Sequence, residues 1–157
     1  MGGLESAPLP PAGDDDHVLG PGCGPPAAIV YADYECPYCA VLHARLVESG
    51  RRWAFRHFPV RSKHPRAWAA ACAAEAAGLQ GAFEAMHMAL FADQARLEDP
   101  HLWERAQRLG LDLARFDADR RSEAVAARVR RDFESGVRAG VVTTPTAFED
   151  GVMRAGT

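Results

Sequence analysis

Two cysteines separated by two residues are the groups in this chain best suited to chemistry. The run Cys36-Pro37-Tyr38-Cys39 pairs two thiols at a spacing that serves either thiol–disulfide exchange or one half of a zinc site. A structural zinc site needs a second pair of ligands at a comparable spacing. The other two cysteines are isolated and the six histidines are scattered along the chain. The pattern therefore favours redox chemistry, and we expect neither a metal nor a cofactor.

A strand and a helix are expected to position the two thiols. Residues 27–32 form a short, partly β-branched run after a stretch rich in glycine and proline, which predicts a buried strand. Apolar residues then recur at helical spacing from Cys39 onward. Pro37 suits the first helical position, so Cys36 falls at the N-cap and Gly50 ends the helix. The free N–H groups and the dipole at this end of a helix stabilise a thiolate.

This placement predicts different roles for the two thiols. Cys36 is expected to be exposed and to attack a disulfide, forming a mixed disulfide. Cys39 lies one helical turn further on and is expected to be more buried. It would attack the sulfur of Cys36 and release the reduced partner, and the reverse sequence would oxidise a dithiol.

The rest of the chain is predicted to alternate between sheet and helix. Residues 53–58 indicate a second strand, parallel to the first through a right-handed crossover. Residues 64–139 show helical periodicity throughout, with about four helices, and residues 141–154 predict a β-hairpin that turns at 149–151. The expected division is a flexible tail (1–16), a first part of the sheet domain (17–61), an inserted helical domain (62–139) and a closing hairpin (140–157).

Composition excludes several classes of function. The 157 residues suit one domain, and a net charge of −3 argues against nucleic-acid binding. No apolar run reaches the roughly 18–20 residues that a membrane span needs. The first 16 residues lack the basic start and apolar stretch of a secretory signal, which predicts a cytoplasmic protein.

Four segments together resemble the DsbA-like family of thioredoxin-fold oxidoreductases. The resemblance implies an α/β, thioredoxin-like fold with an inserted helical domain, and thiol–disulfide exchange with protein or peptide thiols and disulfides. Glutathione is a further candidate partner. The matching segments are residues 16–20, 30–39, 55–59 and 142–146. The resemblance as a whole covers about residues 15–153.

The same resemblance implies a binding role for the segment before the hairpin. In that family the proline matching Pro145 is cis and faces the two cysteines. The backbone of the residue matching Thr144 would then pair with an extended substrate segment, as an added strand does.

Two departures from the family pattern carry consequences. Relatives often have a carboxylate six residues before the first cysteine, where this chain has Val30; Asp33 and Glu35 are closer in sequence but are expected to face the surface. The family's last helix, which follows the hairpin, is missing here. Its absence predicts an uncovered sheet face and favours a homodimer.

Two other functions compete with disulfide exchange. One is a glutathione-dependent transferase or isomerase on the same fold, although such relatives usually carry serine at the first cysteine position. The other is a non-catalytic binding module, which would tolerate replacement of Cys36.

Overall fold

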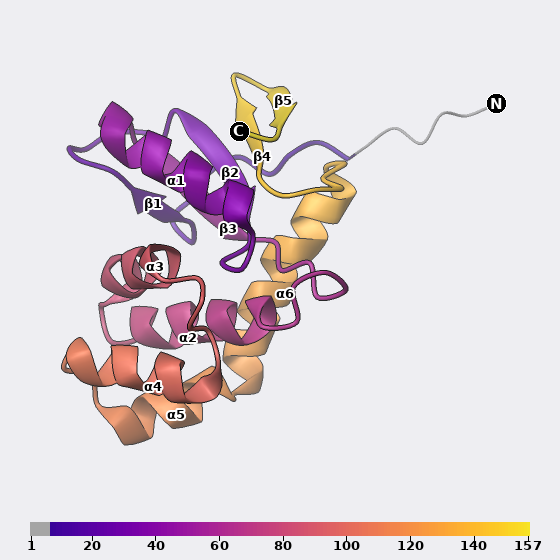
Figure 1. The fold of residues 1–157 in the computed structure, drawn as a ribbon. Helices are drawn as coiled ribbons and strands as arrows, with labels where there is room; N and C mark the ends of the chain where they lie inside the picture. The colour runs from indigo at the N-terminus through magenta and orange to yellow at the C-terminus, as the bar shows by residue number, and fades with distance from the viewer. Residues whose placement is uncertain (1–6) are drawn as a thin grey trace.

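A computed structural model describes residues 7–157 as a five-stranded sheet, flanked by helices on both faces and joined to a helical block (Figure 1). The sheet is built from segments far apart in the sequence, because it begins before the helical block and ends after it. The elements in chain order are β1 (His17–Leu19), β2 (Ala28–Ala32), α1 (Pro37–Ser49), β3 (Trp53–His57), α2 (Ala67–Gly78), α3 (Phe83–Ala92), α4 (Asp99–Arg108), α5 (Leu113–Arg120), α6 (Glu123–Arg138), β4 (Thr146–Glu149) and β5 (Val152–Ala155).

The sheet has the strand order β1-β3-β2-β4-β5. β2 and β3 are parallel and the other neighbours are antiparallel. The predicted parallel pair and the predicted hairpin are therefore confirmed. β2 lies at the centre, so the turn that follows it, which leads to the two cysteines, emerges from the middle of the sheet.

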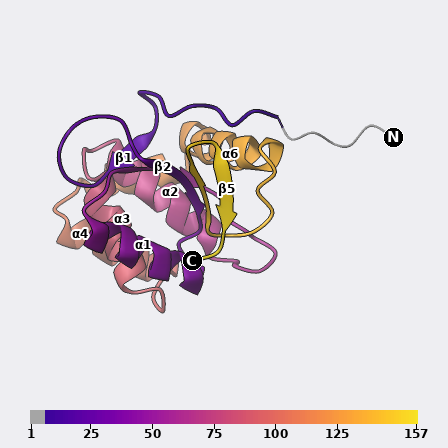
Figure 2. The same cartoon turned by 90° about the horizontal axis from the view of Figure 1, so that it is seen from above.

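The two faces of the sheet are buried against different partners. Val30 and Phe55 point toward α1 and the helical block, whereas Tyr31 and Ala54 point toward α6, as the alternation of side chains along a strand requires. Figure 2 shows the strands between α1 and α6. Part of the sheet is uncovered, as expected, because all four residues of β5 are exposed, whereas Tyr31 and Ala54 on the central strands are fully buried.

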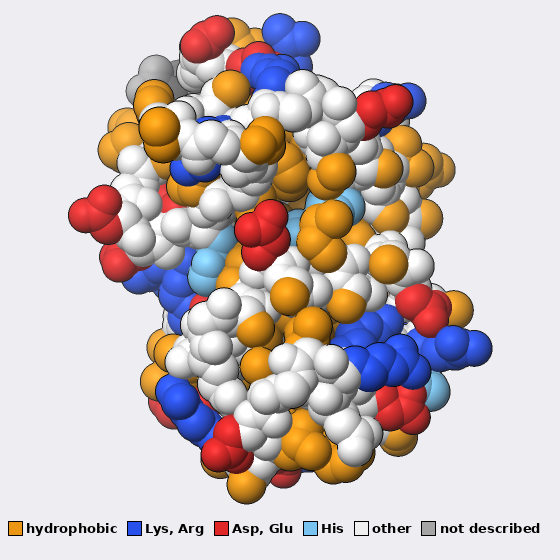
Figure 3. Space-filling view, turned by 90° about the vertical axis from the view of Figure 1, so that its left-hand side faces the viewer, with side chains coloured by type: hydrophobic (Ala, Val, Ile, Leu, Met, Phe, Trp, Pro, Cys, Tyr) orange, Lys and Arg blue, Asp and Glu red, His pale blue; other side chains and the backbone are white. Residues whose placement is uncertain are grey.

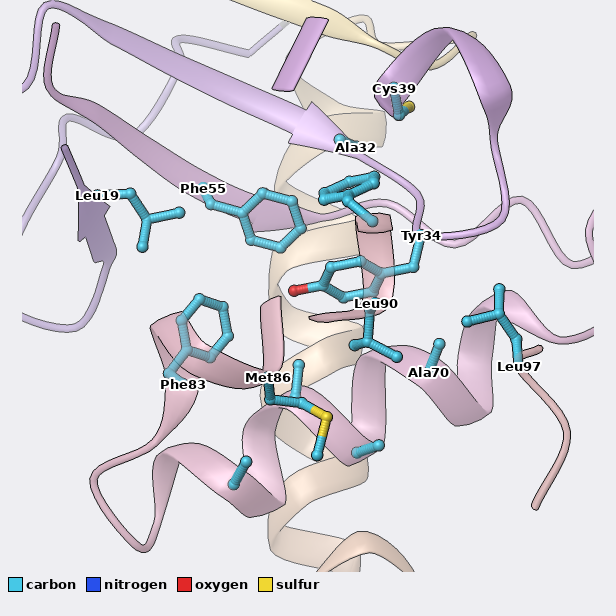
Figure 4. Packing of buried hydrophobic residues seen from close by; sticks show 14 of the residues in the cluster. Leu19, Ala32, Tyr34, Cys39, Phe55, Ala70, Phe83, Met86, Leu90 and Leu97 are labelled. Carbon is cyan, nitrogen blue, oxygen red and sulfur yellow. The ribbon is translucent and has the colours of Figure 1, made fainter. Parts of the chain in front are cut away.

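The principal core fills the space between the sheet and the helical block. Tyr34 reaches from the turn after β2 toward α3, beside Phe55 of β3 and close to Leu90 and Met86 (Figure 4). Its hydroxyl hydrogen-bonds Nδ1 of His87 at 2.8 Å. This one side chain therefore joins the turn before the cysteines to the helical block.

The segment before β1 packs on the face that α6 covers. Leu9 and Ala12 contact the apolar cluster there, and Arg56 binds the carbonyl of Pro11 and the carboxylate of Asp16. Of the predicted flexible tail, residues 1–6 lie outside the described residues, and the remainder lies against the body of the protein.

The helical block contains five helices among the described residues, α2 to α6, so the prediction of about four is wrong. The unpredicted element is α5, which has eight residues and only one buried side chain, Phe116. Such a short helix does not repeat its apolar face often enough to give a periodic signal. Asp112 caps it by accepting a hydrogen bond from the backbone N–H of Arg115.

A glycine lets α6 approach the sheet. A Cβ atom added to Gly136 would lie 2.8 Å from the ring of Phe58 and 2.9 Å from that of Tyr31. Both rings are buried and neither is free to swing away. The hydroxyl of Tyr31 also hydrogen-bonds Ser135, next to this glycine.

We expect Gly136→Ala to destabilise the protein. Overpacking costs about 1–3 kcal/mol, which exceeds the roughly 0.5–1 kcal/mol that alanine contributes to helix formation. Thermal unfolding followed by circular dichroism should give a melting temperature several degrees lower. Gly78→Ala is the matched control, because its added Cβ would lie 3.4 Å from the nearest atom. Equal melting temperatures for Gly136→Ala and the wild type would contradict this account of the interface.

Candidate active site

The two cysteines lie at the N-terminus of α1, where the sequence placed them. Cys36 is the N-cap residue with extended backbone angles, Pro37 occupies the first turn, and Gly50 ends the helix in the left-handed region at φ 67°. No side chain caps the first turn. The unpaired N–H groups at this end therefore face the sulfur of the N-cap residue.

Cys36 is less exposed than expected. Only 3% of its surface is accessible, so the prediction of an exposed attacking thiol is wrong. When protonated, its Sγ donates to the carbonyl oxygen of Thr144 at 3.5 Å, which brings the segment before β4 over the sulfur. A hollow of about 230 Å³ lies beside it, and its walls include Cys36, Tyr38, His64 and Val142.

The surroundings of Cys36 stabilise its thiolate. A hydrogen bond from the Cys39 thiol is the main cause that lowers the pKa of Cys36, from 9.0 to about 5. Burial opposes this shift, whereas the side chain of Thr144 and the backbone N–H groups of Cys39 and Tyr38 support it. A pKa lowered to about 5 favours the thiolate at neutral pH, which is the form that attacks disulfides.

Cys39 has the opposite character. It is 1% exposed, and burial, together with the hydrogen bond to Cys36, raises its pKa far above the usual range for a thiol. The backbone N–H of Asp33 donates to its sulfur at 3.4 Å and partly offsets this effect. One thiol is thus ionised and the other is held as a protonated neighbour.

Asp33 organises the turn that leads into α1. Its side chain is fully buried, so the prediction that it faces the surface is wrong. One carboxylate oxygen accepts from the backbone N–H of Glu35, and the other accepts from the backbone N–H of Val60 and from Nδ1 of His64. The turn folds around the carboxylate of Asp33 because a buried carboxylate needs hydrogen-bond donors.

Three further residues support the turn from the loop after β3 and from the helical block. Arg66 binds the carboxylate of Glu35 through its Nε and its backbone N–H. The side-chain amide of Gln94 donates to the carbonyls of Tyr34 and Cys36 at 2.9 and 2.8 Å. Sequence reasoning missed Arg66, Gln94 and His64, since nothing in their local sequence marks partners about 30 to 60 residues away.

The segment before β4 forms one wall of the hollow. The Thr144–Pro145 peptide bond is cis, and both residues are buried. The hydroxyl of Thr146 donates to the carbonyl of Thr143 and holds the bend. Tyr38 and Val142 stand beside it with 65% and 88% of their surfaces exposed. Two apolar side chains therefore flank the approach to Cys36.

One histidine–carboxylate cluster has the composition of a metal site. Nε2 of His17 and of His57 lie 2.6 and 2.8 Å from the same oxygen of Glu75. A metal-bound histidine usually donates its second ring N–H to an acceptor. Nδ1 of His57 has no partner among the described residues. The cluster thus fits hydrogen bonding better than metal binding. The bonds from both histidines overcome the opposing effect of burial and lower the pKa of Glu75.

Histidine side chains also reach the surface between the two parts of the molecule. Figure 3 shows them at mid-height, between the sheet part above and the helical block below. Of the isolated cysteines, Cys23 is exposed in the loop before β2, and Cys72 is buried in α2, where burial raises its pKa to about 11. Neither lies in the hollow beside Cys36.

A family model for the DSBA-like thioredoxin domain matches residues 61–157, and the chain belongs to this family. The DsbA-like resemblance and the thioredoxin-like fold expected from the sequence are therefore confirmed. The matched range begins after the two cysteines.

Solved structures of related proteins share the fold. A thioredoxin-like oxidoreductase from Silicibacter pomeroyi DSS-3 is 27% identical, with a TM-score of 0.79 over 92% of this chain and 85% of that chain. The thiol–disulfide exchange protein alpha-DsbA2 from Wolbachia pipientis is 18% identical, with a TM-score of 0.75 over 88% and 78% of the two chains. BdbD from Bacillus subtilis in its oxidised form is 19% identical, with a TM-score of 0.73 over 96% and 89%.

The chain also resembles part of a group of larger curated proteins. It is 41% identical over 157 residues to Na(+)/H(+) antiporter NhaA 3 of Salinispora tropica, and 37% identical over 151 residues to NhaA 1 of Mycolicibacterium vanbaalenii. These matches cover 95% and 91% of this chain but 24% of each antiporter. The chain thus spans about a quarter of the length of these relatives. Within residues 7–157, no helix is both long and apolar enough to cross a membrane.

We expect the thiolate of Cys36 to form at unusually low pH. Absorbance at 240 nm, which follows thiolate formation, should rise with a midpoint near pH 5, and the rate of alkylation by iodoacetamide should fall below that pH as the sulfur gains its proton. Cys36→Ser should remove this transition, whereas Cys72→Ser, which replaces a buried thiol outside the hollow, should keep it. A midpoint near 9 in the wild type would contradict the described environment.

Proposed function

We propose that this domain is a thiol–disulfide oxidoreductase that exchanges disulfides with protein substrates through Cys36 and Cys39. The observation that carries the proposal is the pairing of a thiolate with a lowered pKa and a buried, protonated thiol one helical turn away. Membership of the DSBA-like thioredoxin family supports the same function. Protein or peptide thiols and disulfides are the proposed partners, and no cofactor takes part.

The proposed reaction has two exchange steps. The thiolate of Cys36 attacks one sulfur of a substrate disulfide, which breaks the S–S bond and expels the other sulfur as a thiolate. Cys39 then gives its proton to solvent and attacks the sulfur of Cys36 as a thiolate. This step forms the Cys36–Cys39 disulfide and releases the second substrate sulfur in its reduced form. The reverse sequence transfers the disulfide to a substrate dithiol.

Two backbone segments are proposed to hold the substrate while the sulfurs react. The segment at Thr144 and the cis Pro145 lies over Cys36, so an extended substrate placed along it would bring its own sulfur to the hollow. The middle residues of the motif, Pro37 and Tyr38, are exposed at the mouth and would contact the same substrate.

The compartment would set the direction of the reaction. In a reducing cytoplasm, which the sequence predicts, the domain would act as a reductase or isomerase, because the glutathione pool would reduce its disulfide. Glutathione as a partner and a homodimer stay predictions. The glutathione-dependent transferase is the weaker alternative, because that chemistry needs no second thiol.

Single replacements should separate the roles of the two cysteines. Cys36→Ser should abolish turnover in an insulin-reduction assay with dithiothreitol, since the attacking sulfur is gone. Cys39→Ser should accumulate a mixed disulfide with substrate, visible by mass spectrometry and reversed by reductant. Cys23→Ser, which alters an exposed thiol away from the site, should retain wild-type turnover. A non-catalytic binding module would instead keep its function in Cys36→Ser.

The redox potential should lie between those of thioredoxin and DsbA. A lower pKa of the attacking thiol stabilises the reduced form, and the value of about 5 for Cys36 falls between about 7 in thioredoxin and about 3.5 in DsbA. Their potentials are about −270 and −120 mV. Equilibration in glutathione buffers, read by thiol alkylation and mass, gives the value directly. A potential outside this window would show that other contacts dominate, and the absence of a reversible disulfide would overturn the proposed function.

A further inference from the structure

His64 lies between the buried acid of the active-site turn and the hollow beside Cys36. Its side chain is 20% exposed, on the loop after β3, and it lines the hollow together with Cys36. Nδ1 of the ring is 2.8 Å from the carboxylate of Asp33, whose side chain is fully buried. The histidine is therefore anchored at one end and open to the substrate region at the other.

The contact with Asp33 fixes which ring nitrogen is free. An ionised carboxylate only accepts hydrogen bonds, so Nδ1 must carry the hydrogen. Nε2 is then a base in the neutral ring and an acid in the imidazolium. A carboxylate that orients an imidazole in this way is the arrangement by which enzymes present one histidine nitrogen to a reacting group.

We propose that His64, held by Asp33, is the acid–base group that moves the proton of the substrate thiol. This inference rests on the proposed function. It assigns the transfer of a proton to or from the substrate sulfur, which neither cysteine performs. Cys36 is ionised and needs no base of its own, but a substrate sulfur must gain or lose a proton in every cycle.

In the reducing direction, the thiolate of Cys36 attacks a substrate disulfide and a new S–S bond forms as the old one breaks. The departing sulfur takes the electron pair of the broken bond, and Nε2 of the His64 imidazolium gives it a proton. In the oxidising direction, neutral Nε2 of His64 accepts the proton of the substrate thiol. The substrate sulfur attacks Cys36, the Cys36–Cys39 bond breaks, and Cys39 leaves as a thiolate.

The other ionisable groups around the hollow are poorly suited to this transfer. Lys63 and Tyr38 line the same hollow, but the salt bridges and hydrogen bonds of residues 7–157 include no carboxylate that orients either side chain. Asp33 is buried and occupied by its three donors, and Glu35, on the adjoining turn, is paired with Arg66. Histidine is the side chain that both takes and gives a proton near neutral pH.

The test replaces the ring but keeps the contact with Asp33. In His64→Asn the side-chain amide nitrogen stands near the position of Nδ1 and can donate to Asp33, but no titratable nitrogen faces the hollow. His101→Asn is the matched control, on α4 and outside the hollow. Each protein is assayed from pH 5 to 9 with two oxidised substrates, a peptide disulfide and 5,5′-dithiobis(2-nitrobenzoate), whose departing thiol is ionised at neutral pH.

We expect His64→Asn to reduce the peptide disulfide at least tenfold more slowly at pH 7 and to lose the part of the pH profile that histidine supplies. It should react with the aromatic disulfide at the wild-type rate, because that departing sulfur needs no proton. The same measurement shows that Cys36 and the fold around it are intact. His101→Asn should match the wild type with both substrates.

Two results would overturn the inference. One is a wild-type rate and pH profile of His64→Asn with the peptide disulfide, with His64→Ala lowering only the melting temperature; His64 would then be a structural clamp. The other is an equal loss with both substrates, which would place the effect on Cys36. If the wild type reduced neither substrate, the proposed function itself would fail.

Discussion

The buried carboxylate of Asp33 is the constraint on which the active-site geometry depends. An ionised group without water must find several donors, and Asp33 finds them in two backbone N–H groups and one imidazole. These hydrogen bonds bring the loop after β3 against the turn before α1. The same residue's backbone N–H donates to Cys39. The start of α1, the buried thiol and one wall of the hollow are thus set by the pairing of a single charge.

The helical block completes this arrangement instead of merely covering the sheet. The amide of Gln94, from the segment between α3 and α4, holds two carbonyls of the active-site turn, and His87 of α3 binds the hydroxyl of Tyr34. On the other side, Asp132 of α6 accepts from the backbone N–H of His57 at the end of β3. The helical block therefore holds both the turn that carries the cysteines and the end of β3.

The features that sequence reasoning predicted are those encoded over a few residues. Pro37 and Gly50 mark the ends of α1, a β-branched run marks β2, and an acidic residue before glycine marks the hairpin turn, so these elements and the two cysteines were found. The burial of Asp33 and the low exposure of Cys36 depend on segments distant in the chain, His64 and Thr144, which no local pattern connects. The α5 helix was missed because it is too short to show a period.

The contact between Cys36 and Thr144 joins residues 108 positions apart. During synthesis on a ribosome, Cys36 emerges long before the segment at Thr144 that covers it. The central strand β2 likewise emerges long before its partner β4. Contacts of such separation form late in folding, because a long loop must first be closed. A growing chain would thus carry Cys36 beside Cys39 but without the contact from Thr144, which can form only when synthesis has passed residue 144. The covering of Cys36 is therefore among the last steps that complete the domain.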